Sequence, residues 1–101
     1  MMPNVLLEEI ASTASAMKPF STVRGYVFGS VLKSNFRWTD VDVLVVCDDI
    51  VDVPSVRPAL ASVCDRAPID LLVMSAAEEK QLNFVFEQGC RLLFELSASN
   101  S

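Results

Sequence analysis

The sequence predicts an α/β domain, close to an α+β two-layer sandwich, with a mixed four-stranded sheet covered by helices. Stretches with apolar residues every three or four positions alternate along the chain with short runs of β-favouring residues. The run at 40–47, DVDVLVVC, is apolar on both faces, as in a central strand. The chain has 101 residues, of which 51% are hydrophobic, and this is enough for one core.

The first half of the chain is predicted to contain one long helix and two strands. Leu6, Ile10 and Ala14 form an apolar stripe along a helix at 5–17, which Pro19 ends because the residue before a proline disfavours the helical conformation. After this helix we expect a strand at 23–28, a helical turn at 31–34, a loop at 35–39 and the central strand at 40–47.

A second helix is predicted after the acidic turn at 48–52. Pro54 and Pro58 lie near its start, where proline is tolerated because the first amides of a helix have no intrahelical partner. Pro68 ends the helix, and the run IDLLVM that follows predicts a buried strand at 69–74. The buried face of the helix is expected to comprise Val56, Leu60, Val63 and Cys64.

A third helix is predicted from a capping box, in which Ser75 and Glu78 satisfy each other's backbone amides, so that the helix begins at Ala76. It is expected to run to about Glu87, with Gly89 just past its end. A last strand at 91–96 completes a single domain at 1–96, followed by a disordered tail at 97–101. The side chains that this helix is expected to bury are Leu82, Val85 and Phe86.

Charge and composition exclude several classes of protein. Thirteen acidic and eight basic residues give a net charge of −5, which disfavours non-specific binding to a phosphate backbone. Since the chain has no histidine, acid–base or metal chemistry must use carboxylates, lysine, tyrosine or cysteine. We interpret Cys47, Cys64 and Cys90 as small buried residues in a reducing compartment. No signal peptide or membrane span is expected, and the expected location is the cytoplasm.

Three aspartates stand at the openings of apolar strands. Asp40 and Asp42 are two residues apart, so their carboxylates lie on the same face of a strand, where they repel each other and lose hydration. A divalent cation with a preference for oxygen ligands, such as Mg²⁺, offsets that cost. Asp70 opens the next strand, and three carboxylates at one point suit a two-metal phosphoryl or nucleotidyl transfer site. Alternatively, Asp70 is an exposed strand-edge residue or caps a turn.

Gly29 and Ser30 follow an apolar strand directly and precede the expected helical turn. Glycine allows a ligand to approach the backbone closely, and the amides at a helix start attract phosphate oxygens. A plain turn is the alternative interpretation of this dipeptide.

These residues together resemble a known signature. Phe28-Gly29-Ser30, nine further residues, and then Asp40-Val41-Asp42-Val43 are similar to the motif of the polymerase-β-like nucleotidyltransferases. The compact chain is similar to the minimal nucleotidyltransferase branch of that family, as found in toxin–antitoxin pairs with HEPN-type ribonucleases. The resemblance covers residues 23–96 and implies the nucleotidyltransferase fold.

The resemblance implies roles for the acidic residues. Asp40 and Asp42 would bind the catalytic and the nucleotide-associated Mg²⁺ ions, two in number. Asp70 would complete the metal site and help to deprotonate the acceptor hydroxyl.

The resemblance also implies roles in binding the nucleotide. Gly29 and Ser30 would hold the β- and γ-phosphates, and Thr39 matches the Ser or Thr that often precedes the first aspartate of the family. Lys33 stands where the family usually has arginine, so it can contact a phosphate as a point charge but without the guanidinium fork. Arg37 is a further basic candidate, and a solvated loop charge is the alternative for both.

The activity that the resemblance implies is Mg²⁺-dependent transfer of a nucleoside monophosphate, AMP from ATP, to a hydroxyl of a protein or RNA. The implied role is the antitoxin half of a pair, with a HEPN-type toxin or an RNA as acceptor. Larger members hold acceptors with an extra helical domain, so here we expect a partner macromolecule or a homo-oligomer interface to do so. Two alternatives are a non-catalytic antitoxin that neutralises a partner by complex formation, and a plain scaffold with an incidental acidic cluster.

Three aromatic residues bear on partners. Phe84 lies between inward-facing positions of the third helix, so the helical phase predicts that it points away from the core. Phe36 and Trp38 lie in the loop before Asp40. Such aromatics either dock a partner or stack on a nucleobase, or else pack locally over the small core.

Overall fold

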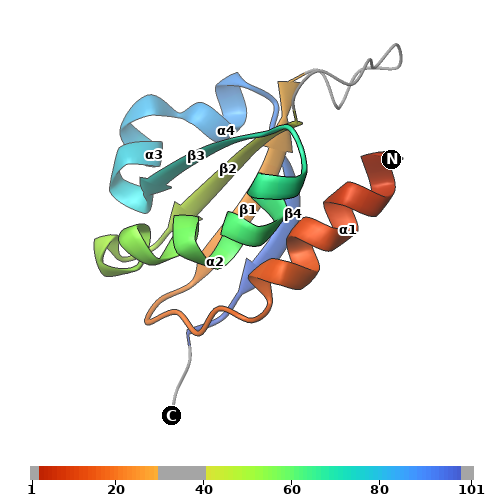
Figure 1. The fold of residues 1–101 in the computed structure, drawn as a ribbon. Helices are drawn as coiled ribbons and strands as arrows, with labels where there is room; N and C mark the ends of the chain where they lie inside the picture. The colour runs from red at the N-terminus through yellow and green to blue at the C-terminus, as the bar shows by residue number, and fades with distance from the viewer. Residues whose placement is uncertain (1–2, 30–40, 99–101) are drawn as a thin grey trace.

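The computed structural model describes residues 3–29 and 41–98 and confirms the predicted fold class, a four-stranded mixed sheet flanked by helices (Figure 1). Within these residues, helices and strands alternate along most of the chain. In chain order the elements are α1 (Pro3–Ala14), β1 (Val23–Phe28), β2 (Val41–Cys47), the 3₁₀ turn η2 (Ile50–Asp52), α2 (Val53–Arg66), β3 (Ile69–Ser75), α3 (Ala76–Leu82), α4 (Phe84–Glu87) and β4 (Arg91–Leu96).

The strand order in the sheet is β3-β2-β1-β4. β1 is antiparallel to both β2 and β4, whereas β2 and β3 are parallel and joined by the crossover helix α2. Because parallel strands begin at the same edge of a sheet, the first residues of β2 and β3 lie side by side. Asp42, near the start of β2, and Asp70, near the start of β3, therefore lie at the same end of the sheet.

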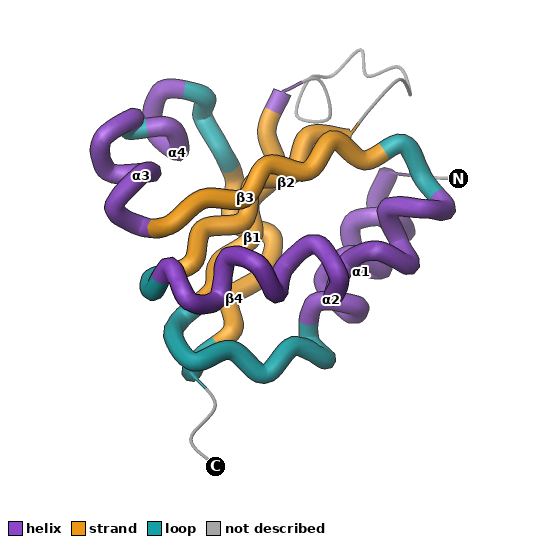
Figure 2. Tube along the Cα trace, turned by 60° about the vertical axis from the view of Figure 1, so that its left-hand side comes forward, coloured by secondary structure: helices purple, strands orange, loops and turns teal. Residues whose placement is uncertain are grey.

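One face of the sheet packs against α1 and α2 (Figure 2). Val41, Val43 and Val45 of β2 point into this layer and are fully buried, together with Leu6 of α1 and Leu60 of α2. Burying a side chain of this size stabilises the fold by roughly 1.5–3 kcal/mol. Because every second side chain of β2 points to this face, the alternate valines of the strand form the centre of the main core.

The opposite face is covered in part by α3 and α4. Leu44 and Val46 of β2 are buried here with Met74 of β3. The ring of Phe84 on α4 packs edge-to-face on Phe28 of β1, with 5.1 Å between the ring centroids. β2 is thus buried on both faces, which confirms its prediction as the central strand.

The expectation of one continuous helix at 76–87 is wrong. The predicted capping box is present at Ser75, but the helix stops at Leu82 because Asn83 adopts a left-handed conformation (φ 50°, ψ 39°). The side chains of α4 therefore start in a new helical phase. Leu82 and Phe86, expected in the core, are 60% and 78% exposed, whereas Phe84, whose helical phase predicted an outward direction, packs inward.

Other boundaries agree closely with the sequence predictions. β1 and β4 have the predicted limits, and α1 ends three residues early because the chain continues in tighter turns, with Met17 N donating to Ala14 O at 2.9 Å. The helical turn and loop predicted at 31–39, with Phe36 and Trp38, lie outside the described residues. No helix in the described part of the chain is long and apolar enough to cross a membrane.

The three cysteines are free thiols, and none is exposed: Cys47 is buried, while Cys64 and Cys90 are partly buried. Burial raises the pKa of all three thiols, that of Cys47 to about 11. Because the reactive form of cysteine is the thiolate, these residues are poor nucleophiles at neutral pH. Their packing supports the prediction that they act as small apolar side chains.

Candidate functional site

Asp42 and Asp70 lie side by side on neighbouring parallel strands. The register of β2 and β3 pairs Asp42 directly with Asp70. Neighbouring strands are about 4.8 Å apart, and paired residues point to the same face of a sheet. Asp42 is half-buried and Asp70 is exposed, so the pair lies at a surface that a ligand can reach.

Gly29 lies directly against the carboxylate of Asp42. Gly29 follows β1 with φ +76°, a conformation that L side chains rarely adopt. A Cβ atom at this position would overlap Oδ2 of Asp42 and would lie 3.3 Å from its Cγ. The end of β1 and the start of β2 therefore form one compact unit in which glycine leaves room for the acidic side chain.

An aromatic pair borders this unit. Phe28 is the register partner of Asp42 on β1, so its ring lies on the same face of the sheet. The ring of Phe84 on α4 packs edge-to-face on the ring of Phe28. α4 thus packs on the residue of β1 that pairs with Asp42, and β3, which carries Asp70, is an edge strand of the sheet.

The remaining site residues predicted from the sequence lie outside the described residues. They are Ser30, Lys33, Arg37, Thr39 and Asp40. Of the predicted set, the structure describes and brings together Gly29, Asp42 and Asp70.

Two described carboxylates are fewer than a closed metal site needs. Among residues 3–29 and 41–98, no group of three or more histidine, cysteine, aspartate or glutamate side chains is arranged to hold a metal ion. The described pair still fits Mg²⁺ chemically, because both donors are oxygens on one face and Mg²⁺ is commonly bound through one or two carboxylates together with substrate phosphates.

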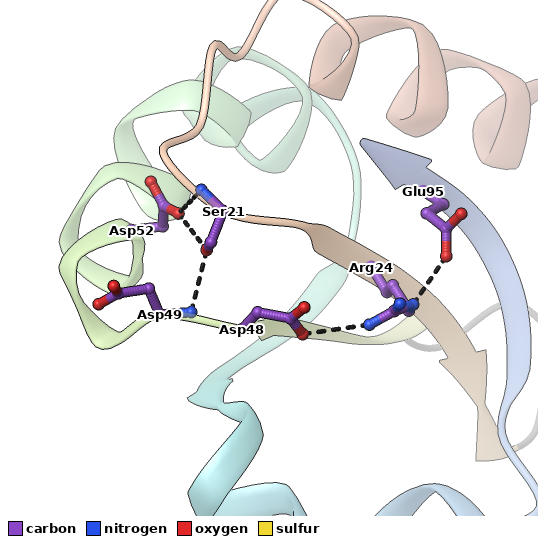
Figure 3. A network of polar contacts seen from close by, with 6 residues as sticks. All are labelled: Ser21, Arg24, Asp48, Asp49, Asp52 and Glu95. Atoms are coloured by element: carbon purple, nitrogen blue, oxygen red, sulfur yellow. Dashed lines mark hydrogen bonds and ion pairs between the residues drawn. The ribbon is translucent and has the colours of Figure 1, made fainter. Parts of the chain in front are cut away.

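A second polar cluster, at the far end of β2, is structural in character (Figure 3). The carboxylate of Asp52, which is 2% exposed, accepts hydrogen bonds from Phe20 N (2.9 Å), Ser21 N (2.9 Å) and Ser21 Oγ (2.6 Å). Burial raises the pKa of Asp52, but these hydrogen bonds outweigh burial, so the pKa lies below its ordinary value. The cluster joins the segment before β1 to the start of α2.

Neighbouring groups extend this cluster over the end of the sheet. Ser21 Oγ accepts a hydrogen bond from Asp49 N at 2.9 Å, and Asp49 in turn caps η2. Arg24 bridges Asp48 (3.1 Å) and Glu95 (2.7 Å) across β1, β2 and β4. The sequence predicted an acidic turn here, but no pattern in it indicated that Asp52 is buried and joins two distant segments.

An open depression of about 640 Å³ lies on the same side of the sheet as α3 and α4. Its inner wall includes Val85 and Cys90, which also pack against the cluster around Leu44. No sequence pattern predicted it, because it follows from the break at Asn83. Its lining residues are Glu79, Asn83, Val85, Phe86, Gly89 and Cys90.

Comparison with models of known protein families gives no match to this chain. Comparison with curated proteins gives no match either. The chemistry of the described side chains therefore supplies the basis for a function.

Proposed function

We propose that this protein is a Mg²⁺-dependent nucleotidyltransferase that moves AMP from ATP to a hydroxyl of a protein or RNA, as the antitoxin half of a toxin–antitoxin pair. One observation carries the proposal: Asp42 and Asp70 are paired in register at the open end of two parallel strands, with the Asp42 carboxylate against Gly29. Carboxylate oxygens on one face of neighbouring strands are ligands that Mg²⁺ prefers, together with the phosphates of a substrate.

The charge of the site limits which ligands it accepts. A triphosphate is repelled by a carboxylate pair in a chain of net charge −5. A divalent cation held by Asp42 and Asp70, together with Asp40, would reverse that repulsion. When bound, Mg²⁺ stabilises negative charge on the attacking and leaving oxygens of an in-line displacement.

The protein's own residues would position the reactants. Gly29 leaves room for the Asp42 carboxylate at the end of β1, while its backbone amide, Ser30 and Lys33 would contact the β- and γ-phosphates. The acceptor hydroxyl attacks the α-phosphorus, its oxygen–phosphorus bond forms, and the bond to the β-phosphate oxygen breaks. The electron pair leaves with pyrophosphate, and Asp70 takes the hydroxyl proton.

The test is transfer of label from ATP to macromolecules. Protein is incubated with Mg²⁺, total RNA and cell extract, and with ATP labelled at either the α- or the γ-phosphate. We expect label from the α-position alone, reduced at least about 100-fold in Asp42→Asn and Asp70→Asn. Asp65→Asn, an exposed aspartate on α2, is the matched control and should transfer normally. Absence of transfer by the unmodified protein, or equal transfer by Asp42→Asn, would contradict the proposal.

A second candidate function is neutralisation of a partner by binding alone. The observation that favours it is the set of large apolar side chains exposed at the Asp52 cluster: Phe20, 77% exposed, Ile50 and Val51. Such side chains at fixed positions suit a protein interface. Co-expression with a HEPN-type ribonuclease separates the two functions, because binding alone predicts that Asp42→Asn still protects the cell whereas Phe20→Ser does not.

A further inference from the structure

We propose that the depression between α3, α4 and the two residues before β4 binds the purine base of the nucleotide, an inference that rests on the proposed nucleotidyl transfer and specifies its substrate. The depression, about 640 Å³ in volume, falls in the size range of small-molecule sites. It lies beside the break between α3 and α4 at Asn83. It is on the face of the sheet that carries Asp42 and Asp70.

Two left-handed residues keep this space open. Asn83 ends α3 with φ 50°, and Gly89 follows α4 with φ 61°, so α4 is a single turn displaced between them. Apart from Gly89 itself and its two chain neighbours, no heavy atom lies within 4 Å of the place where a Cβ of Gly89 would be. Cys90 N then donates to Val85 O at 2.9 Å and returns the chain to the sheet.

Sheet register places the depression within reach of the carboxylates. Cys90, in its wall, immediately precedes Arg91, which pairs with Val27 of β1. The next residue of β1, Phe28, pairs with Asp42 of β2. From β4 to β2 is two strand spacings, about 10 Å, which is within the length of an extended nucleoside triphosphate.

The lining has the chemistry that a flat heterocycle requires. Phe86 offers a ring that is 78% exposed, and Val85 and Cys90 supply apolar walls. Asn83 carries a carboxamide, which pairs with the amino and ring-nitrogen groups of adenine. The carboxylate of Glu79 lies in the wall and accepts a hydrogen bond from Val85 N at 3.3 Å. A base that stacks on such a ring contributes about 1–3 kcal/mol to the binding free energy.

Calorimetric titration tests the assignment in the presence of Mg²⁺. The probes are α,β-methylene-ATP, the corresponding CTP analogue, and tripolyphosphate, which lacks base and ribose. We expect the ATP analogue to bind about tenfold more tightly than tripolyphosphate because the base stacks on Phe86, and more tightly than the CTP analogue because the Asn83 carboxamide pairs with adenine. Phe86→Ala and Asn83→Gly, which keeps the left-handed backbone, should remove that advantage and leave tripolyphosphate binding unchanged. Phe20→Ala removes an equally exposed ring far from the depression and is the matched control.

The outcomes separate this inference from the proposed function. If Phe86→Ala binds the ATP analogue as tightly as Phe20→Ala does, or if tripolyphosphate binds as well as the ATP analogue, the purine site is overturned even where transfer of label occurs. If the ATP analogue binds tightly and loses affinity in Phe86→Ala, but no label is transferred, the purine site stands and the proposed function falls. If none of the probes binds, the purine site is overturned.

Discussion

Two separate constraints, the backbone conformation and the space beside the residue, both require glycine at position 29. Its backbone is left-handed, and the Asp42 carboxylate occupies the space that a side chain would need. Gly89 is also left-handed, but the space around it is open. These two glycines therefore separate the cost of backbone strain from the cost of crowding at the carboxylate.

Gly29→Ala is expected to destabilise the protein more than Gly89→Ala. Each substitution introduces strain of about 1–3 kcal/mol, but only at position 29 must a carboxylate also move. Urea unfolding of both variants measures the two costs, and Mg²⁺ titration of Gly29→Ala should show weaker binding because Asp42 is displaced. Equal destabilisation of the two variants would show that the contact with Asp42 has no energetic consequence.

The lowered pKa of Asp52 predicts that the stability of the protein depends on pH. Because the pKa of Asp52 is lower in the folded protein than its ordinary value of 3.8, its contribution is complete above that value and is lost as the pH falls through the folded pKa. Asp52→Asn should cost about 2 kcal/mol at pH 7, and the difference from the unmodified protein should shrink below about pH 4.

Denaturant titrations at several pH values measure this difference. Asp65→Asn, on the exposed face of α2, serves as the control and should unfold like the unmodified protein throughout. A destabilisation by Asp52→Asn that stays constant down to pH 2 would show that the carboxylate charge has no part in joining Phe20 and Ser21 to η2.

At the scale of elements, the break between α3 and α4 decides which aromatic side chains support the fold. A continuous helix would have buried Leu82 and Phe86, as the spacing predicted. Instead, the left-handed Asn83 resets the phase, so Phe84 packs on Phe28 and Phe86 faces outward. Asparagine tolerates this conformation better than most residues.

Phe84→Ala and Phe86→Ala should therefore differ strongly in stability. Phe84→Ala removes a packed ring and is expected to lower the free energy of unfolding by about 2–3 kcal/mol, less than for a fully buried phenylalanine because Phe84 is only partly buried. Phe86→Ala is expected to change it by less than about 0.5 kcal/mol. Chemical denaturation of the two variants provides the comparison. The opposite order would indicate that α3 and α4 form one continuous helix.

At the scale of the whole molecule, acidity and the carboxylate pair together predict a dependence on divalent cations. A ligand that binds the folded state alone stabilises it by RT ln(1 + [L]/Kd). Mg²⁺ with a non-hydrolysable ATP analogue at about 30 times its Kd should therefore add about 2 kcal/mol. Asp42→Asn should lose this gain, whereas Asp65→Asn should keep it. Differential scanning calorimetry measures the effect, and a gain of equal size in Asp42→Asn would place the cation elsewhere.

Local patterns in the sequence were sufficient to predict much of this molecule. The alternating valines of β2, the capping box at Ser75, and Pro54 and Pro68 at the two ends of α2 correctly predicted element types and most boundaries, because each depends on contacts within a few residues. Pro58, expected near the start of that helix, lies inside it. The positions of Asp42 and Asp70 at the openings of two apolar strands were also predictable, but their proximity depended on those two strands being neighbours in the sheet. The sequence carried no pattern that predicted Asn83 as a helix break, because asparagine occurs inside helices as well as at their ends.

The sequence by itself determined that the chain alternates between helices and strands and that acidic side chains stand at two strand openings, since both follow from residue type and short-range spacing. The tertiary structure alone decided that β2 and β3 pair with Asp42 opposite Asp70, that Asp52 is buried against a segment some thirty residues away, and that Phe84 rather than Phe86 joins the core. These outcomes depend on which segments meet in space, and the free energy of such contacts is shared between residues far apart in the chain.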